Sequence, residues 1–176
     1  MKLTNILNEV FNKEKYIYCD MDGVLVDFNK GFKQQFGMLP NEFETKYGSK
    51  EFWNKVNGGG SKFWRDLPPM PDMDRLWNFI SPYIKSLLTS PSKDQSSLIG
   101  KYGWVKDHLS PKPKVLFRYT KNKQEVLNNI PEDERSNYIM IDDRMEVVQN
   151  WIQAGGEAIL HRSADQTIKE LQRLGL

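Results

Sequence analysis

Two aspartates separated by one residue follow an apolar stretch in the first part of the chain. Residues 15–19 are rich in types that favour β-strands, and Asp20 and Asp22 come directly after them, followed by Gly23. Residues two apart in an extended chain point to the same side, so the two carboxylates are expected to lie close together. A hard divalent cation such as Mg²⁺, which takes oxygen ligands, relieves their repulsion most simply. Gly23 permits a tight turn beside such a site.

Polar residues also stand at the ends of two later apolar stretches, Thr89-Ser90 after one and Asp142-Asp143 after the other. Asp-x-Asp-Gly alone is as consistent with a turn that ends a strand as with a metal site. Asp142-Asp143 alone would most often be a solvated turn. However, the carboxyl ends of neighbouring parallel strands meet at one edge of a sheet. Four carboxylates at one edge require a cation, so the two acidic pairs together predict a Mg²⁺ site.

A phosphate ester suits this set of groups. An aspartate can attack phosphorus and form an aspartyl-phosphate that water then hydrolyses, while Mg²⁺ lowers the repulsion between nucleophile and phosphate. Thr89, Ser90 and nearby backbone N–H groups can hold the other phosphate oxygens. A lysine would neutralise the remaining negative charge of the phosphate and the carboxylates. Lys123, at the start of a predicted helix, is favoured over Lys121, and a solvated basic face is the alternative for the other cations nearby.

Strand and helix patterns alternate along most of the chain. Apolar, β-rich stretches predict strands at residues 15–19, 83–88, 114–117, 138–141 and 158–160. Amphipathic or capped stretches predict helices at residues 1–14, 28–36, 72–81, 98–109, 122–129, 145–154 and 164–174. This alternation is typical of an α/β fold, here a three-layer, Rossmann-like parallel sheet with helices on both faces. The first helix is expected to pack on its own domain, with partner binding as the weaker alternative.

The segment between the first two predicted strands is too long for a simple connection. Residues 29–75 are therefore predicted to form a small, mostly helical cap, and residues 1–28 and 76–176 to form the core domain. The cap segment is rich in aromatic residues, among them Phe43, Tyr47, Phe52, Trp53, Phe63 and Trp64. Most of these should form the cap's own core. One or two could stack on a planar base, because α/β proteins bind ligands at the carboxyl ends of their strands.

The stretch 15–28 resembles the first motif of the haloacid dehalogenase-like (HAD) phosphohydrolases: apolar residues, Asp-x-Asp-Gly, and then Val-Leu-x-Asp. The later motifs of that family follow in order, with Ser or Thr at the second strand, Lys near the third and paired acids at the fourth. The resemblance implies that Asp20 is the nucleophile and that Asp22 is the general acid and base. It also implies that Asp143 contacts the metal directly. Asp142 is the next candidate for a metal ligand.

Within the HAD phosphohydrolases, four longer stretches of this chain resemble the 5'(3')-deoxyribonucleotidases in particular. The stretches that carry it are residues 63–71, 88–91, 101–105 and 141–144. The resemblance covers residues 16–161 and implies a (deoxy)nucleoside monophosphate as the substrate. It places Phe28 where that family has an aromatic residue against the base. The other candidate substrate contacts are Phe52, Trp53, Trp64, Lys101 and Arg144.

Composition limits the class of protein to which this chain can belong. The chain has 176 residues, 39% hydrophobic and 27% charged, as expected of one folded domain with a small insertion. Its net charge of +2 is too small to indicate binding to nucleic acid or a membrane. Cys19 is the single cysteine, and no apolar run suits a membrane span or a secretory signal. These features predict a cytoplasmic protein and leave the oligomeric state open, a homodimer included.

Three functions remain. The favoured one is a Mg²⁺-dependent phosphomonoesterase that hydrolyses (deoxy)nucleoside monophosphates through an aspartyl-phosphate. An enzymatic alternative acts on another small phosphoester or on a polynucleotide end, for which the basic stretch 112–123 is the only support. A catalytically inactive binding module is disfavoured, because clustered acids cost stability without a use.

Overall fold

The computed structural model describes residues 14–176, and in that part of the chain five strands form one parallel sheet. The strands are β1 (Tyr16–Cys19), β2 (Ile84–Thr89), β3 (Val115–Phe117), β4 (Tyr138–Asp142) and β5 (Glu157–Leu160). Their order is β3-β2-β1-β4-β5, with β1 in the centre. Each strand begins and ends within one residue of its predicted bounds, and the predicted parallel sheet is confirmed.

Helices separate the strands, as predicted. The α-helices of the described residues are α2 (Phe28–Phe36), α3 (Pro40–Tyr47), α4 (Ser49–Gly58), α5 (Gly60–Arg65), α6 (Met73–Ile80), α7 (Ser96–His108), α8 (Met145–Gln153) and α9 (Ala164–Arg173). Three 3-10 segments are η1 (Ser81–Tyr83), η2 (Thr120–Asn129) and η3 (Glu132–Asn137). The predicted helix 122–129 is thus present as η2. The helix predicted at 1–14 lies, except for Glu14, outside the described residues. None of the helices between residues 14 and 176 has the length and hydropathy needed to cross a membrane.

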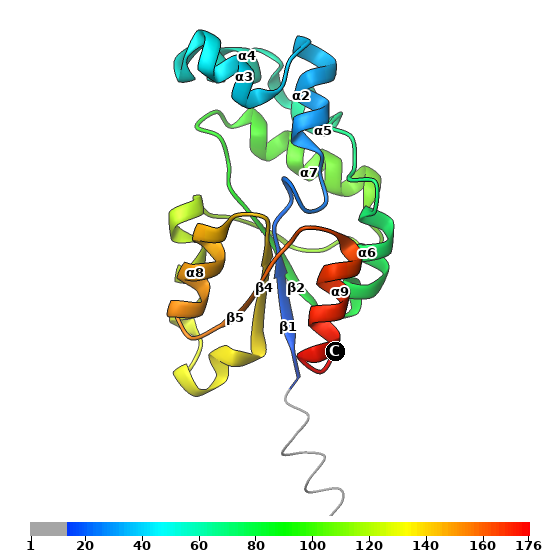
Figure 1. The fold of residues 1–176 in the computed structure, drawn as a ribbon, viewed down its shortest axis with the longest axis vertical. Coiled ribbons are helices and arrows are strands. Elements are labelled where there is room, and N and C mark those ends of the chain that lie inside the picture. Colours follow the sequence, from blue (N-terminus) through cyan, green and yellow to red (C-terminus); the bar gives the residue numbers. More distant parts are fainter. Residues whose placement is uncertain (1–13) are drawn as a thin grey trace, which may run out of the picture.

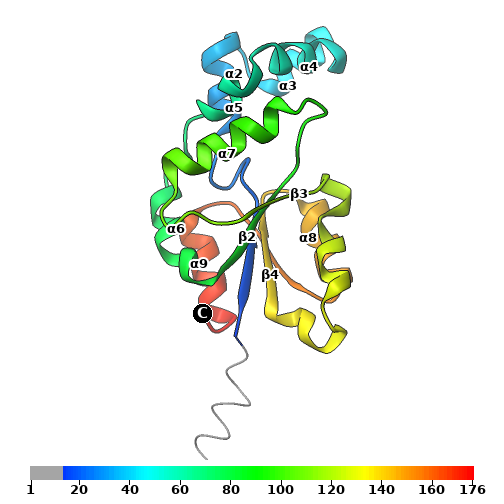
Figure 2. The same cartoon turned by 180° about the vertical axis from the view of Figure 1, so that it is seen from behind.

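Alternate residues of the strands point to opposite faces of the sheet and build two cores. Ile17 and Cys19 of β1 belong to one apolar cluster, together with Leu171 of α9. Tyr18 belongs to a second cluster, together with Trp151 of α8. Figures 1 and 2 show the corresponding layers, with α6 and α9 on one face of the sheet and α8 on the other. Burying a large apolar side chain is worth about 1.5–3 kcal/mol, so both layers stabilise the sheet.

The carboxyl ends of the strands point toward helices α2 to α5, which lie together at the end of the molecule farthest from the C terminus (Figure 1). Asp27 begins α2 by accepting a hydrogen bond from Lys30 N at 2.9 Å. One turn later, the ring of Phe32 lies 5.5 Å from that of Phe43 in α3 and 5.2 Å from that of Phe52 in α4. Aromatic packing therefore holds these helices together.

Helix α5 packs closely against α7, the helix that follows β2. A Cβ at Gly100 of α7 would overlap with Ser61 O and the Trp64 side chain, so this approach requires glycine. Arg65 in α5 donates two hydrogen bonds to the carboxylate of Asp107 in α7, at 2.6 and 3.1 Å. The helices inserted after β1 are thus joined to the core through α7.

Strands β3 and β5 form the two edges of the sheet. β3 has only 3 residues and follows the sequence Pro111-Lys112-Pro113-Lys114. Both lysines are exposed. Leu87 N of β2 donates to Lys114 O at 2.8 Å, which ties this segment to the sheet on its inner side.

Candidate active site

The chain turns after β1 and brings Asp20 and Asp22 to the carboxyl edge of the sheet. Asp20 N still donates to Ile141 O of β4 at 2.9 Å, so Asp20 continues the ladder of the sheet. Beyond it, Val26 N donates to Met21 O at 2.8 Å and closes a compact loop. The extended geometry expected across the two acids therefore stops at Asp20, and the two carboxylates take different partners.

Asp20 meets the acidic pair at the end of β4. Carboxylate oxygens of Asp20, Asp142 and Asp143 lie within 4.8 Å of one another, a spacing at which they could share one cation. Asp142 is fully buried. Burial, together with the charge of Asp20, raises the pKa of Asp142 to about 7, and the same two causes raise the pKa of Asp143. A bound cation would favour the charged form of both groups.

Lys123, on η2, supplies a positive charge to this acidic cluster. Its side chain is 2% exposed, and its Nζ lies 2.9 Å from Asp20 Oδ1 and 2.7 Å from Asp142 Oδ2. Burial alone would lower the pKa of Lys123, but the two carboxylates outweigh burial and raise it, so the ammonium stays charged. Lys121, the other lysine considered from the sequence, is exposed.

Asp22 lies apart from the acidic cluster and forms an ion pair with Lys101 of α7. The same ammonium donates to Thr89 Oγ1 at 2.9 Å. This differs from the prediction that the Asp22 carboxylate joins the other acids at a metal, because Lys101 neutralises it instead. Thr89 was predicted to bind phosphate and Lys101 to contact the substrate. Both are buried, and neither lines the cavity beside the cluster.

That cavity has a volume of about 710 Å³ and is lined by residues of the strand ends and of the inserted helices. On the strand side it exposes Asp20, Asp22, Asp143, Ser90 and Arg144. On the helical side it exposes Phe28, Phe52, Trp53 and Trp64. The structure therefore brings most of the predicted site residues to one cavity, with acids on one side and aromatic rings on the other.

Hydroxyl groups form another polar part of the cavity wall. Ser90 Oγ lies 3.0 Å from Thr120 Oγ1, and Arg144 Nη1 lies 3.5 Å from the same oxygen. Arg144 N donates to Asp142 Oδ1 at 2.9 Å, which fixes the start of α8 beside the acids. Sequence reasoning missed Thr120 and its neighbour Tyr119, which also lines the cavity. Both follow β3 closely, so the strand-end argument used elsewhere could have found them.

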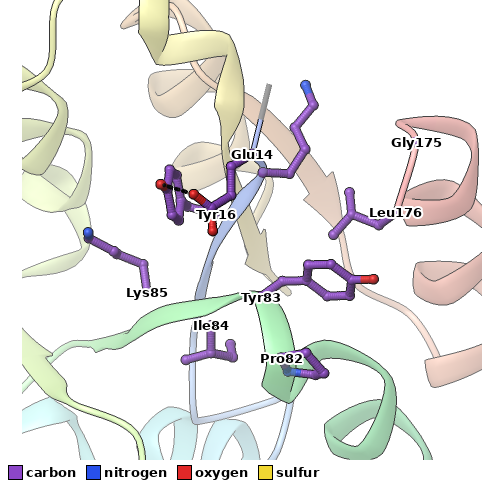
Figure 3. A pocket seen from close by; sticks show the side chains of 9 residues that line it. Glu14, Tyr16, Pro82, Tyr83, Ile84, Lys85, Gly175 and Leu176 are labelled. Atoms are coloured by element: carbon purple, nitrogen blue, oxygen red, sulfur yellow. Dashed lines mark hydrogen bonds between the residues drawn. The ribbon is translucent and has the colours of Figure 1, made fainter. Parts of the chain in front are cut away.

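A second cavity, of about 520 Å³, lies where β1 and β2 begin (Figure 3). Its wall includes Tyr16, Tyr83, Ile84 and Leu176, and Lys85 Nζ lies 5.0 Å from the centre of the Tyr16 ring. Among residues 14–176, the one group of acids close enough to share a cation lies at the other edge of the sheet. The first cavity is therefore the candidate active site.

Gly23→Ala should disrupt the acidic cluster. Gly23 has a φ of +79°, and a Cβ there would overlap with the Asp143 carboxylate. Gly37→Ala is the matched control, because Gly37 has a φ of +81° but open space around its Cβ position. Both variants should lose about 1 kcal/mol of stability through backbone strain. Only Gly23→Ala should abolish the rise in melting temperature on adding Mg²⁺. Equal responses to Mg²⁺ would contradict this role of Gly23.

Comparison with known proteins identifies solved structures with a similar fold. No protein-family model and no curated protein sequence matches this chain. A hydrolase structure from Streptococcus pneumoniae TIGR4 matches with a TM-score of 0.56 and 17% identity, over 91% of this chain and 100% of that one. A HAD-superfamily hydrolase from Ehrlichia chaffeensis matches with a TM-score of 0.54 and 12% identity, over 93% of this chain and 99% of that one. A HAD family enzyme from Bacteroides thetaiotaomicron, in a magnesium complex, matches with a TM-score of 0.50 and 16% identity, over 92% and 100%.

These likenesses concern the fold. The predicted α/β fold, a HAD-like three-layer arrangement around a parallel sheet, is confirmed. The narrower resemblance to 5'(3')-deoxyribonucleotidases and the cap boundaries at residues 29–75 stay predictions from the sequence.

Proposed function

We propose that this chain is a Mg²⁺-dependent phosphomonoesterase that hydrolyses (deoxy)nucleoside monophosphates through an aspartyl-phosphate intermediate. One observation carries the proposal: the acidic cluster, with Lys123 inside it, borders a cavity whose other side is aromatic. The acids and the ammonium suit a phosphate and its cation. Rings such as those of Phe28 and Trp53 suit a planar base. The likeness in fold to HAD hydrolases supports a hydrolase.

The reaction needs two displacements at phosphorus. In the first, a carboxylate oxygen of Asp20 attacks the phosphorus, the bond to the ribose oxygen breaks, and that oxygen takes a proton from Asp22. In the second, water attacks the phosphorus and gives a proton to Asp22, and the bond to Asp20 breaks to release inorganic phosphate. Both aspartates line the cavity. Lys123, 2.9 Å from Asp20 Oδ1, orients the nucleophile and offsets the charge of the phosphate.

The donor atoms of the acidic cluster fit Mg²⁺. Asp20, Asp142 and Asp143 offer carboxylate oxygens, which hard cations prefer. When bound, Mg²⁺ supplies positive charge that stabilises the phosphate oxygens during transfer. The structural relative from Bacteroides thetaiotaomicron is a magnesium complex, which supports this choice of ion.

A phosphate-release assay over a substrate panel tests the proposal. The panel contains ribo- and deoxyribonucleoside monophosphates, sugar phosphates, p-nitrophenyl phosphate and an oligonucleotide with a terminal phosphate, each with Mg²⁺ or with EDTA. We expect the highest kcat/KM for nucleoside monophosphates and no turnover in EDTA. A preference for sugar phosphates or for the oligonucleotide would overturn the nucleotide assignment. Failure to release phosphate from any substrate would overturn the enzyme assignment.

Mg²⁺ should raise the melting temperature, because it binds the folded acidic cluster in preference to the unfolded chain. At a hundredfold excess over Kd the gain is about 2.7 kcal/mol, or about 5–10 °C. Asp143→Asn removes a ligand charge and should blunt most of this rise. Asp27→Asn is the matched control. Asp27 also lines the cavity, but its side chain caps α2 through Lys30 N, a bond that asparagine can also accept. Equal blunting in both variants would count against Asp143 as a ligand.

Phe28 should matter for substrates that carry a base. Its ring lines the cavity and lies 5.7 Å from that of Trp64 and 6.4 Å from that of Phe52. Stacking on a base is worth about 1–3 kcal/mol, and leucine keeps part of the apolar surface, so Phe28→Leu should lower kcat/KM for a nucleoside monophosphate about tenfold. Hydrolysis of deoxyribose phosphate should barely change.

Phe36→Leu provides the control for this prediction. The ring of Phe36 packs at a tilt against that of Phe32 in the same aromatic cluster, with the ring centres 4.6 Å apart, but Phe36 is not among the residues that line the cavity. The control should therefore leave both substrates nearly unaffected. If Phe28→Leu lowers kcat/KM equally for both substrates, Phe28 acts through packing rather than through stacking on a base.

A further inference from the structure

Lys101 of α7 is a buried cation whose ammonium lies among active-site residues. Lys101 is 1% exposed. Its Nζ forms an ion pair with Asp22 Oδ2, donates to Thr89 Oγ1 at 2.9 Å, and lies 5.2 Å from the centre of the Trp64 ring. These partners come from the loop after β1, the end of β2 and α5. Segments far apart in the sequence therefore meet at one ammonium group.

Stability alone does not account for a lysine at this position. Taking an ammonium out of water costs several kcal/mol, and a buried ion pair is often no more stabilising than apolar residues of the same volume. The side chain of Asp22 is 32% exposed on the cavity wall and would stay hydrated without a cation. Helix α7 also buries Trp104 and Val105, so an apolar side chain would suit its inner face. The charge of Lys101 is better explained by its effect on Asp22.

The ion pair determines where the Asp22 carboxylate lies. Lys101 engages Oδ2 and holds the group apart from the acidic cluster. Asp22 Oδ1 is buried and has no hydrogen-bond partner within the described part of the chain. Unpaired buried oxygens are costly and uncommon, and this one belongs to a residue on the cavity wall. Lys101 therefore holds in a fixed position the carboxylate of a residue on the cavity wall, which a group that exchanges a proton with a bound substrate requires.

We propose that Lys101 is a positioning residue for the proton transfers of Asp22. It holds the Asp22 carboxylate in place on the cavity wall, where this group meets the departing oxygen and then the attacking water. Thr89 orients the Lys101 ammonium in this arrangement. The inference rests on the phosphomonoesterase activity proposed above, in which Asp22 gives its proton to the departing oxygen as the bond to phosphorus breaks. A displacement of about 1 Å in such a group can lower the rate about a hundredfold.

The test uses leaving groups that need this proton to different degrees. Phenyl phosphate and p-nitrophenyl phosphate are similar in shape, but phenolate is a basic leaving group and p-nitrophenolate is a stable anion. Lys101→Met should lower kcat/KM for phenyl phosphate about ten- to hundredfold and for p-nitrophenyl phosphate less than about threefold. A deoxynucleoside monophosphate should behave like phenyl phosphate. The ratio kcat/KM is the useful quantity, because it reports the transfer step and excludes the later hydrolysis.

Further variants separate positioning from folding. Lys106→Met makes the same change at an exposed lysine of α7 and should leave the three substrates unaffected. Asp22→Asn removes the group through which Lys101 acts, so adding Lys101→Met to Asp22→Asn should cause no further loss. Lys101→Gln keeps an N–H donor for Asp22 and should retain part of the rate. It also provides the comparison if Lys101→Met does not fold.

The outcomes separate this inference from the proposed function. A loss that depends on the leaving group and vanishes in the Asp22→Asn background supports the role of Lys101. Equal losses for the two aryl phosphates, or an undiminished further loss in the Asp22→Asn background, would overturn it. If the unmutated protein releases phosphate from none of the substrates, the proposed function itself fails, which is seen before any variant is compared.

Discussion

Asp20→Asn should lower kcat/KM for phosphate release by about three orders of magnitude or more while the protein stays folded. An amide is a poor nucleophile, so the aspartyl-phosphate cannot form. The fold should tolerate the change, because the charge of Asp20 contributes to the repulsion that raises the pKa of buried Asp142. The ion pair between Lys123 Nζ and Asp142 Oδ2, at 2.7 Å, is retained in this variant.

Acid-quench experiments with radiolabelled substrate check this expectation. Labelled phosphate should remain on the unmutated protein and be missing from Asp20→Asn, and beryllium fluoride should bind at Asp20 in the unmutated protein. Asp27→Asn makes the same chemical change at another carboxylate of the cavity and should still trap the label. Near wild-type turnover in Asp20→Asn would end the covalent mechanism.

Lys123→Met should lower the free energy of unfolding in EDTA by about 3–5 kcal/mol, because it leaves two buried carboxylates without their cation. Phosphate release should also fall, by about a hundredfold or more, since no ammonium then offsets the charge that develops in the transition state. Mg²⁺ should restore part of the lost stability, because it can neutralise the same carboxylates. Denaturant unfolding with and without Mg²⁺ measures both effects.

Lys121→Met is the control for this substitution. Lys121 is two residues away on η2 and exposed, so its replacement should change stability and turnover little. The comparison also decides which of the two lysines considered from the sequence, Lys121 or Lys123, binds the phosphate. A larger loss of phosphate release in Lys121→Met than in Lys123→Met would assign the phosphate contact to Lys121.

The sheet and the acidic edge could be predicted because local patterns encode them. A central parallel strand is buried on both faces, so the four apolar residues before Asp142 are sufficient to mark β4. Asp20 and Asp142 then follow from where the apolar stretches stop. Their convergence needs only the rule that parallel strands end at one edge.

The partner of Asp22 could not be predicted in the same way. Lys101 lies 79 residues further along the chain. Its contact with Asp22 depends on the turn that ends the extended geometry after Asp20, and on the close approach of α5 that Gly100 permits. Neither is visible as a local pattern. The one available signal was a lysine on the side of a predicted helix that also carries Trp104, which is a reason to expect a buried ionic partner.

The short edge strand β3 has a consequence for how copies of this chain can meet. Edge-to-edge joining of two sheets needs a strand with free N–H and C=O groups along its open side. Pro111 and Pro113 have no N–H, and exposed Lys112 and Lys114 would face the same charges in a second copy. This edge therefore discourages both aggregation and a homodimer with one continuous sheet. The protection lies before β3, whereas Tyr119 and Thr120 follow it, so it leaves the cavity untouched.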